Sequence, residues 1–327
     1  MAGGKGGGPP GVQSGGTAEA KKAGPGIRGW VTAALLIAMV AVSFAAIFVR
    51  LSRAPALAVA AWRVGLALAV LGPMGALALA RSRPRAREVL GSCLAGGFLA
   101  CHLWAWTTSL GLTSLASSVI LVTSEPLFVM LGSRVIYGEG VSRRGLAGAA
   151  VAIAGSLLIG AGDWRLGPEP FLGDLLALSG AFLAAAYFLT GRGVRRSLGN
   201  LAYVTLAYGT CFGVLYLVAG FTGTPLAPYP AREWLWFALL ALGPTVAGHT
   251  LLNWALGYVP ASSVAVTLLG EPVGATALAV VILGEMPAPW QVVGGVLVVG
   301  GIYLYLADPA HGVGLGRSRP PRSLQGR

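Results

Sequence analysis

Val-Thr-Ser-Glu-Pro at residues 122–126 has a counterpart in Leu-Leu-Gly-Glu-Pro at residues 268–272, and 146 residues separate the two glutamates. Each stretch places one carboxylate and one proline inside an otherwise apolar segment. The same separation relates further pairs: Gly111 and Gly257, Ser117 and Ser263, Gly138-Glu139 and Gly284-Glu285, Gly148 and Gly294, and Gly155 and Gly301. A motif that recurs at a constant spacing predicts that the chain is a duplicated unit.

The composition indicates a membrane protein. Hydrophobic residues make up 55% of the chain, charged residues only 10%, and the mean hydropathy is +0.75, outside the usual range of soluble domains. A helix needs roughly 20 apolar residues to cross a hydrocarbon core about 30 Å thick. Ten stretches meet this requirement. They are residues 27–49, 56–80, 89–112, 115–136, 145–162, 172–191, 201–221, 234–258, 261–283 and 288–306.

The number of spans per repeat predicts the architecture. Five is odd, so the second copy enters the bilayer from the opposite side and the two copies form inverted repeats. We therefore predict an all-α integral membrane protein with ten transmembrane helices in two inverted five-helix repeats. The predicted parts are a disordered tail at 1–26, a first repeat at 27–165, a second repeat at 171–306 and a basic tail at 307–327. Inverted repeats around a site near the midplane suit alternating access.

The distribution of the basic residues indicates how the chain is oriented in the membrane. The chain has a net charge of +12, but eighteen of its 23 Lys and Arg residues fall on one side of the predicted spans together with both termini. Such a bias marks the cytoplasmic side. We expect a multi-pass protein of the cell membrane, the inner membrane in a bacterium, with both termini cytoplasmic and with lipid rather than nucleic acid around it.

The layout resembles the EamA-type branch of the drug/metabolite transporter superfamily over roughly residues 27 to 306. The ten-helix pattern, the two apolar-Glu-Pro elements, the two Gly-Glu pairs and Trp62-Arg63 carry the resemblance. One departure is Glu125, because the first copy often has a small or polar residue before the proline. The resemblance implies a carrier of small metabolites, often an amino-acid exporter, with substrate in a central cavity and no cofactor. No Gly-x-x-x-x-Gly-Lys-Ser/Thr loop for nucleotide phosphate is present either.

Glu125 and Glu271 are the predicted proton-coupling residues. An ionised carboxylate at the centre of a span costs about 2.5–3.5 kcal/mol, so each must be protonated, paired or in contact with a wet cavity. The alternative is that each carboxyl satisfies local hydrogen bonds at a proline kink.

The predicted substrate-binding residues are Arg63, His102, Trp106, His249 and Asn253. Arg63 is the one permanent cation that lies away from the ends of the predicted spans, and a guanidinium binds a carboxylate with two hydrogen bonds. Trp106 follows His102 by four residues and Asn253 follows His249 by four, so each pair shares a helix face. A structural ion pair for Arg63 and helix–helix hydrogen bonds for the histidines are the alternatives. We expect no metal site, because no ligand-spaced cysteine or carboxylate accompanies either histidine.

The sequence thus predicts a secondary transporter, not an enzyme, that exports small metabolites such as amino acids. An exporter of cationic drugs or a metabolite exchanger is the second interpretation. An intramembrane enzyme is a distant third, because His102 and Glu125 belong to different helices. Glycines on the helices at 145–162 and 288–306 suggest close helix packing, and a homodimer through these helices is a further hypothesis.

Overall fold

The computed structural model describes residues 25–113, 115–138, 140–160, 168–283, 286 and 288–307. Apart from residues 25, 26 and 307, the predicted tails lie outside this part, as do Glu139 and Glu285 of the Gly-Glu pairs.

Every regular element of the described part is a helix. In chain order these are α1 (Pro25–Leu51), α2 (Ala56–Ser82), α3 (Ala86–Leu112), α4 (Leu115–Val122), α5 (Glu125–Tyr137), α6 (Arg143–Gly160), α7 (Pro168–Arg195), α8 (Asn200–Thr222), α9 (Ala231–Leu240), the π-helical η1 (Ala241–His249), α10 (Thr250–Ala255), α11 (Ala261–Leu268), α12 (Glu271–Leu278), the π-helical η2 (Ala279–Leu283) and α13 (Pro289–Leu306).

Within the described residues, seven segments are long and apolar enough to cross a membrane. They are Gly29–Leu51, Ala56–Ser82, Ala86–Leu112, Glu169–Arg195, Asn200–Thr222, Ala231–Ala255 and Ala261–Ile282. The expectation of an all-helical membrane protein is confirmed, whereas the number of ten spans and their inverted arrangement stay predictions.

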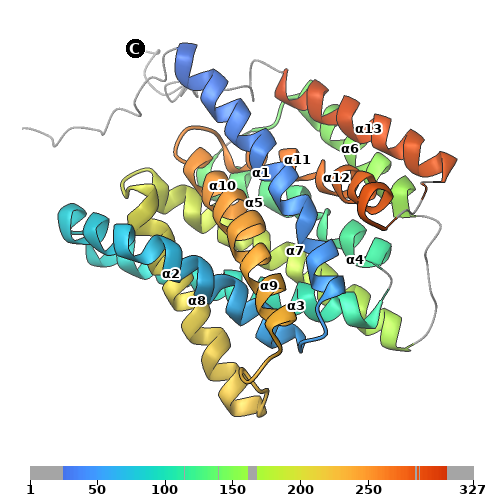
Figure 1. The fold of residues 1–327 in the computed structure, drawn as a ribbon. Coiled ribbons are helices and arrows are strands. Elements are labelled where there is room, and N and C mark those ends of the chain that lie inside the picture. Colours follow the sequence, from blue (N-terminus) through green and yellow to red (C-terminus); the bar gives the residue numbers. More distant parts are fainter. Residues whose placement is uncertain are drawn as a thin grey trace, which may run out of the picture.

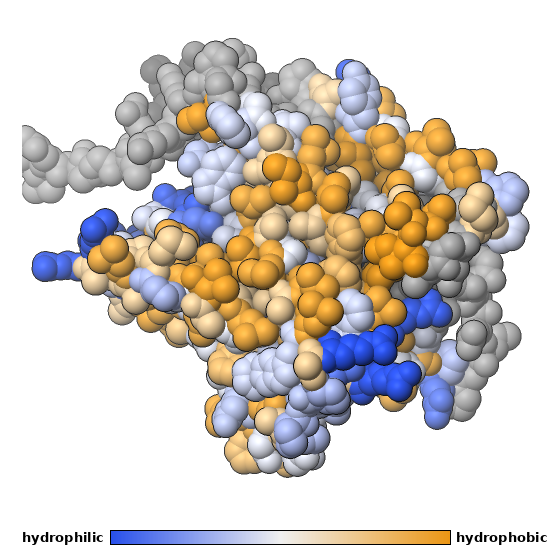
Figure 2. All heavy atoms as spheres, viewed as in Figure 1, coloured by the Kyte–Doolittle hydropathy of each residue, from blue (hydrophilic) through white to orange (hydrophobic). Residues whose placement is uncertain are grey.

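The helices pack into a bundle that presents a hydrophobic surface. α3 packs along α7, α2 along α8, and α1 against η1 and α12, while α6 and α13 lie side by side at one edge (Figure 1). The face shown in Figure 2 is hydrophobic across its middle, and hydrophilic residues gather toward its margins. Large apolar side chains such as Phe221, 89% exposed, lie on the surface. In a membrane these side chains contact lipid.

Both Glu-Pro elements interrupt their helices. Thr123 and Ser124 form a turn between α4 and α5, and Leu269 and Gly270 form one between α11 and α12. Proline has no N–H for the carbonyl four residues earlier, so the helical hydrogen-bond ladder cannot continue. The chain tightens instead: the Ser124 N–H donates to the Leu121 carbonyl at 3.2 Å, and the Gly270 N–H to the Thr267 carbonyl at 3.1 Å. Each glutamate is therefore the first residue of a second half-helix.

The repeated glycines hold α6 against α13. A Cβ atom at Gly155 would lie 2.6 Å from the Gly294 carbonyl oxygen. A Cβ atom at Gly301 would overlap the backbone of α6 at Gly148 and Ala152. The prediction of close packing between these helices is confirmed within one chain, and the homodimer stays a prediction.

Two neighbouring glycines of α13 give a stability test of this contact. We expect Gly301→Ala to destabilise the protein by about 1–3 kcal/mol, the usual cost of overpacking a tight contact, because backbone atoms of α6 cannot move aside. Gly300→Ala is the matched control, since a Cβ atom there meets nothing within 4 Å. Thermal unfolding in detergent, followed by tryptophan fluorescence, measures both. Equal unfolding temperatures for the two variants would contradict the packing described here.

Candidate functional site

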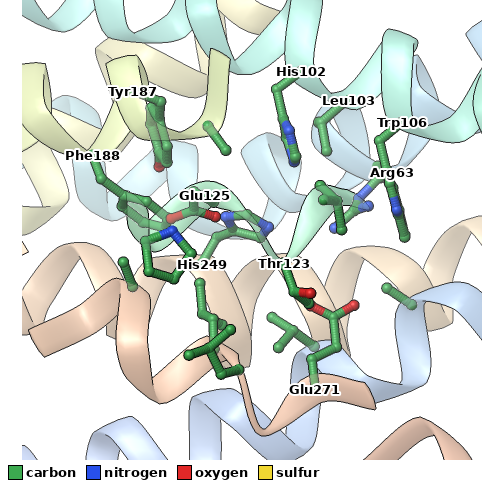
Figure 3. Close-up of a pocket in the computed structure, with 18 residues that line it drawn as sticks. Arg63, His102, Leu103, Trp106, Thr123, Glu125, Tyr187, Phe188, His249 and Glu271 are labelled. Atoms are coloured by element: carbon green, nitrogen blue, oxygen red, sulfur yellow. The ribbon is translucent and has the colours of Figure 1, made fainter. Parts of the chain in front are cut away.

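A buried cavity lies where the two interrupted helices meet α1, α2, α3, α7 and η1 (Figure 3). Its volume is about 50 Å³, well below the roughly 300–1,000 Å³ of pockets that hold small-molecule ligands. The lining residues are Val42, Ala45, Arg63, His102, Leu103, Trp106, Val122, Thr123, Glu125, Pro126, Ala184, Tyr187, Phe188, His249, Ala265, Leu268, Leu269 and Glu271. The free space in the cavity is therefore too small for a metabolite, which can bind only if the surrounding helices move apart.

Arg63 brings a cation into this cavity from α2. Its side chain is 1% exposed, and its Nε donates to the Thr245 hydroxyl at 3.2 Å. Among the described residues the guanidinium makes no other hydrogen bond, and no carboxylate oxygen lies within 4.0 Å of it. Glu271 interacts electrostatically with the guanidinium from beyond this distance, and a buried charge without a hydrogen-bonded counterion is costly. The geometry is therefore suited to an anionic group of a ligand.

The anchor of Arg63 is a consequence of the π-helical winding of η1. Pro244 within η1 has no N–H for the carbonyl of Leu240, and the Thr245 hydroxyl donates to that carbonyl at 3.0 Å. The same hydroxyl accepts the hydrogen bond from Arg63. π-helical turns are frequent at functional sites. The irregular turn thus fixes one edge of the guanidinium and leaves the rest of it directed at the cavity.

The two repeated glutamates reach the cavity from the two interrupted helices. Glu125 is 7% exposed, and its buried Oε1 has no hydrogen-bond partner among the described residues. Glu271 is half-buried. In Figure 3 both carboxyl groups point into the cavity, with Glu125 near His249 and Glu271 near Thr123. Two carboxyl groups and one guanidinium therefore converge on one small space.

Histidine and tryptophan form one wall. Nδ1 of His102 lies 2.9 Å from the carbonyl oxygen of Gly180. A carbonyl can only accept, so Nδ1 carries the proton and Nε2 is the acceptor of the neutral ring. The rings of His102 and Trp106 are nearly parallel, with centroids 6.5 Å apart. Nε1 of Trp106 and Nδ1 of His249 are buried and have no partner among the described residues, so each can bond a ligand.

Asn253 occupies a different place from the one predicted. It is fully buried and does not line the cavity. Its amide Nδ2 donates to the hydroxyl of Tyr187, which does line the cavity. Asn253 therefore holds the hydroxyl of Tyr187 without lining the cavity itself.

The sequence interpretation missed Tyr187 and Phe188 of α7 as wall residues. Together with Ala184 they form a helical face three and four residues apart, which is the signal that could have identified them. The structure brings together the other six predicted residues, Arg63, His102, Trp106, His249, Glu125 and Glu271, around the cavity. Their roles stay predictions.

These features define a multi-pass membrane protein with an internal polar site. The model of the EamA-like transporter family matches residues 29–161 and 171–307. The chain belongs to the EamA-like transporter family. This family and the relatives below are transporters rather than enzymes.

Three curated relatives have the following similarities. The chain is 29% identical over 216 residues to the uncharacterized transporter YdfC of Bacillus subtilis, covering 64% of this chain and 69% of that protein. It is 30% identical over 256 residues to a protein of Streptantibioticus cattleyicolor named "probable terminal-alkyne amino-acid exporter". This match covers 74% of this chain and 79% of that protein. An uncharacterized transporter of Archaeoglobus fulgidus is 27% identical over 204 residues, and the match covers 60% of this chain and 68% of that protein.

The crystal structure of another protein has a similar fold. The TM-score is 0.70 at 22% sequence identity, and the match covers 85% of this chain and 96% of that chain. This likeness concerns the fold alone.

Proposed function

We propose that the protein is a secondary active transporter that exports small metabolites, amino acids or related compounds, by alternating access. The observation that carries the proposal is the buried guanidinium of Arg63, which forms no ion pair within 4.0 Å among the described residues but shares a cavity with Glu125 and Glu271. A zwitterion supplies both charges that such a site lacks: a carboxylate for Arg63 and an ammonium group for a glutamate.

The proposal includes ten transmembrane helices in two inverted repeats. The two segments matched by the family model, 29–161 and 171–307, support it, and so do the two helix interruptions at equivalent positions. Interrupted helices around a central site are typical of transporters with inverted repeats.

The packing of the helices is consistent with a two-fold relation between the repeats. With α1, α3 and α7 as transmembrane helices 1, 3 and 6, and η1 as part of helix 8, the contacts of α3 with α7 and of α1 with η1 are equivalent. The contacts of α2 with α8 and of α6 with α13 then pair a helix with its own counterpart. Such a relation provides two equivalent packings, one open to each side.

Roles within the site follow from the chemistry of each group. Arg63 binds the carboxylate of the substrate, and His102, Trp106 and His249 line its remaining surface. Glu125 and Glu271 carry the coupling proton and exchange it for the ammonium group of the substrate. Asn253 holds the hydroxyl of Tyr187 in place.

The substrate class is supported by one relative, the Streptantibioticus cattleyicolor protein whose name describes an amino-acid exporter. A second candidate, an exporter of cationic drugs or a metabolite exchanger, is favoured by the presence of two carboxyl groups in one cavity. The bias of Lys and Arg supports a protein of the cell membrane with both termini cytoplasmic.

Reconstitution tests the proposal. Purified protein in proteoliposomes is given a labelled amino-acid pool, with and without an imposed pH gradient, beside empty liposomes. We expect uptake of a subset of the pool that depends on the gradient. If the amino acids do not enter in either condition while a labelled quaternary ammonium compound does, the cation exporter replaces the amino-acid exporter.

A further inference from the structure

A buried carboxylate links the two halves of the chain at one end of the bundle. Glu233, in the first turn of α9, is 6% exposed. The Ser52 hydroxyl donates to its Oε2 at 2.6 Å. The backbone N–H of Arg53 lies 3.2 and 3.1 Å from its two oxygens. The segment between α1 and α2 is thereby tied to the start of α9.

A similar carboxylate links the two halves at another loop. Glu88, in the first turn of α3, is 9% exposed. The side chain of Ser197, which follows α7, is within hydrogen-bonding reach of its carboxyl group, and the Ser197 hydroxyl also lies 3.4 Å from the Val194 carbonyl oxygen. Within its own helix cap, Glu88 accepts a hydrogen bond from the backbone N–H of Arg85 at 2.8 Å. A Cβ atom at Gly91, one turn further along α3, would lie 2.7 Å from the Val194 side chain, so the two segments are in contact.

The two links are repeated in the sequence. Val-Arg-Leu-Ser at residues 49–52 corresponds to Val-Arg-Arg-Ser at residues 194–197, and Ala-Arg-Glu at residues 86–88 corresponds to Ala-Arg-Glu at residues 231–233. Both correspondences have a separation of 145 residues, one less than the separation of the Glu-Pro elements.

The local geometry of the two links repeats as well. The serine N–H donates to the valine carbonyl at 3.2 Å in the first copy and at 3.1 Å in the second. The glutamate N–H donates to the carbonyl three residues earlier at 2.9 Å in both. The same turn and the same helix start thus occur once in each half.

The two links lie at opposite ends of the bundle. Ser52 precedes α2 and Glu88 follows it, and α2 has 27 residues, which makes it about 40 Å long. This length exceeds the roughly 30 Å hydrocarbon core. Because the two links flank the two ends of α2 (Figure 1), one link belongs to each face of the membrane.

We propose that the Ser52–Glu233 and Ser197–Glu88 pairs are two equivalent latches, one at each membrane face, and that each must open for the cavity to open to its side. The inference rests on the proposed alternating access. Each latch joins an element of one repeat to an element of the other, so rotation of one repeat against the other separates one pair. In this structure the Ser52–Glu233 hydrogen bond is formed and the segments that carry Glu88 and Ser197 are in contact, while the cavity is too small for a metabolite.

Accessibility of the cavity tests the latches without any substrate. Cys93, Cys101 and Cys211 are replaced by alanine, and Ala184→Cys places one thiol in the cavity wall. A membrane-impermeant maleimide is applied to intact cells and, separately, to inverted vesicles. Glu233→Gln and Glu88→Gln are compared with this parent, and Glu169→Gln, an exposed carboxylate at the start of α7, is the matched control.

We expect the two variants to act on opposite sides. Glu233→Gln should raise the labelling rate from the side of Ser52, and Glu88→Gln from the side of Ser197. Each change should be about tenfold, which corresponds to about 1.4 kcal/mol, because glutamine keeps an acceptor oxygen but loses the charge that strengthens the hydrogen bond. Ser52→Ala and Ser197→Ala, which keep the buried carboxylates, should shift labelling in the same directions. Glu169→Gln should leave both rates unchanged.

Labelling that rises from the same side in both variants, or changes in neither, would overturn the proposal. So would a loss of thermal stability in the glutamate variants while the serine variants label like the parent, because a purely structural role predicts this result. Opposite shifts without any transport by the wild type would contradict the proposed function but not the latches. Transport without opposite shifts would contradict the latches alone.

Discussion

Arg63→Gln is expected to abolish amino-acid transport. We expect the uptake rate at low substrate concentration to fall at least about 30-fold, because removing one partner of a buried charge pair costs about 2–5 kcal/mol. The Thr245 hydroxyl, which holds Nε of Arg63 in the native protein, cannot replace the guanidinium as a carboxylate ligand. Uptake of a labelled amino acid into proteoliposomes measures the effect.

The control for this variant is Arg81→Gln, at the exposed end of the same helix, which should transport like the wild type. Transport of a cation that has no carboxylate should also survive Arg63→Gln. An unchanged rate of amino-acid uptake in Arg63→Gln would show that the guanidinium has a structural role instead.

Glu125→Gln and Glu271→Gln are each expected to remove transport driven by a pH gradient. Glutamine has nearly the same size as glutamate but cannot take up or release a proton, so substrate binding and coupling are separated. Gradient-driven accumulation should fall to the level of empty liposomes. Exchange of labelled for unlabelled substrate, which needs no net proton movement, should remain in at least the variant whose carboxyl does not bind the ammonium group.

The two measurements are made on the same proteoliposome preparation, so that the amount of folded protein is common to both. If both variants accumulate substrate in response to the pH gradient like the wild type, neither carboxyl carries the coupling proton. If both variants lose exchange as well as gradient-driven accumulation, both carboxyl groups bind substrate instead.

A kink at each Glu-Pro element could be expected from the sequence because its cause is local, but the segments 115–136 and 261–283 were each predicted as one span. Pro126 and Pro272 each remove one backbone donor within an apolar segment, and the structure has turns immediately before both. The same cause acts at Pro244, yet the segment at 234–258 was predicted as one helix. The part that η1 plays in the site depends on the hydrogen bond between the Thr245 hydroxyl and Arg63 from another helix. Contacts of this kind are not visible in one segment.

The site was predicted in part for a similar reason. The cost of burying a charge identifies Arg63, Glu125 and Glu271 from the sequence alone, because each must reach a polar space. Whether a neutral polar residue also reaches that space depends on which side chains from other helices pack between it and the cavity. Asn253 and His249 both contact Tyr187 of α7, as a shared face predicts, but Tyr187 rather than Asn253 lines the cavity.

Recognition of a zwitterion by this cavity is measured by the competition of three related compounds for uptake of a labelled amino acid by the wild type. The compounds are the unlabelled amino acid, its amide, which lacks the carboxylate, and its N-acetyl derivative, which lacks the ammonium group. A site between Arg63 and the two carboxyl groups predicts that the intact amino acid competes at least about tenfold better than either derivative, because each derivative leaves one buried charge unpaired. An amide that competes as well as the amino acid would contradict recognition of a zwitterion in this cavity.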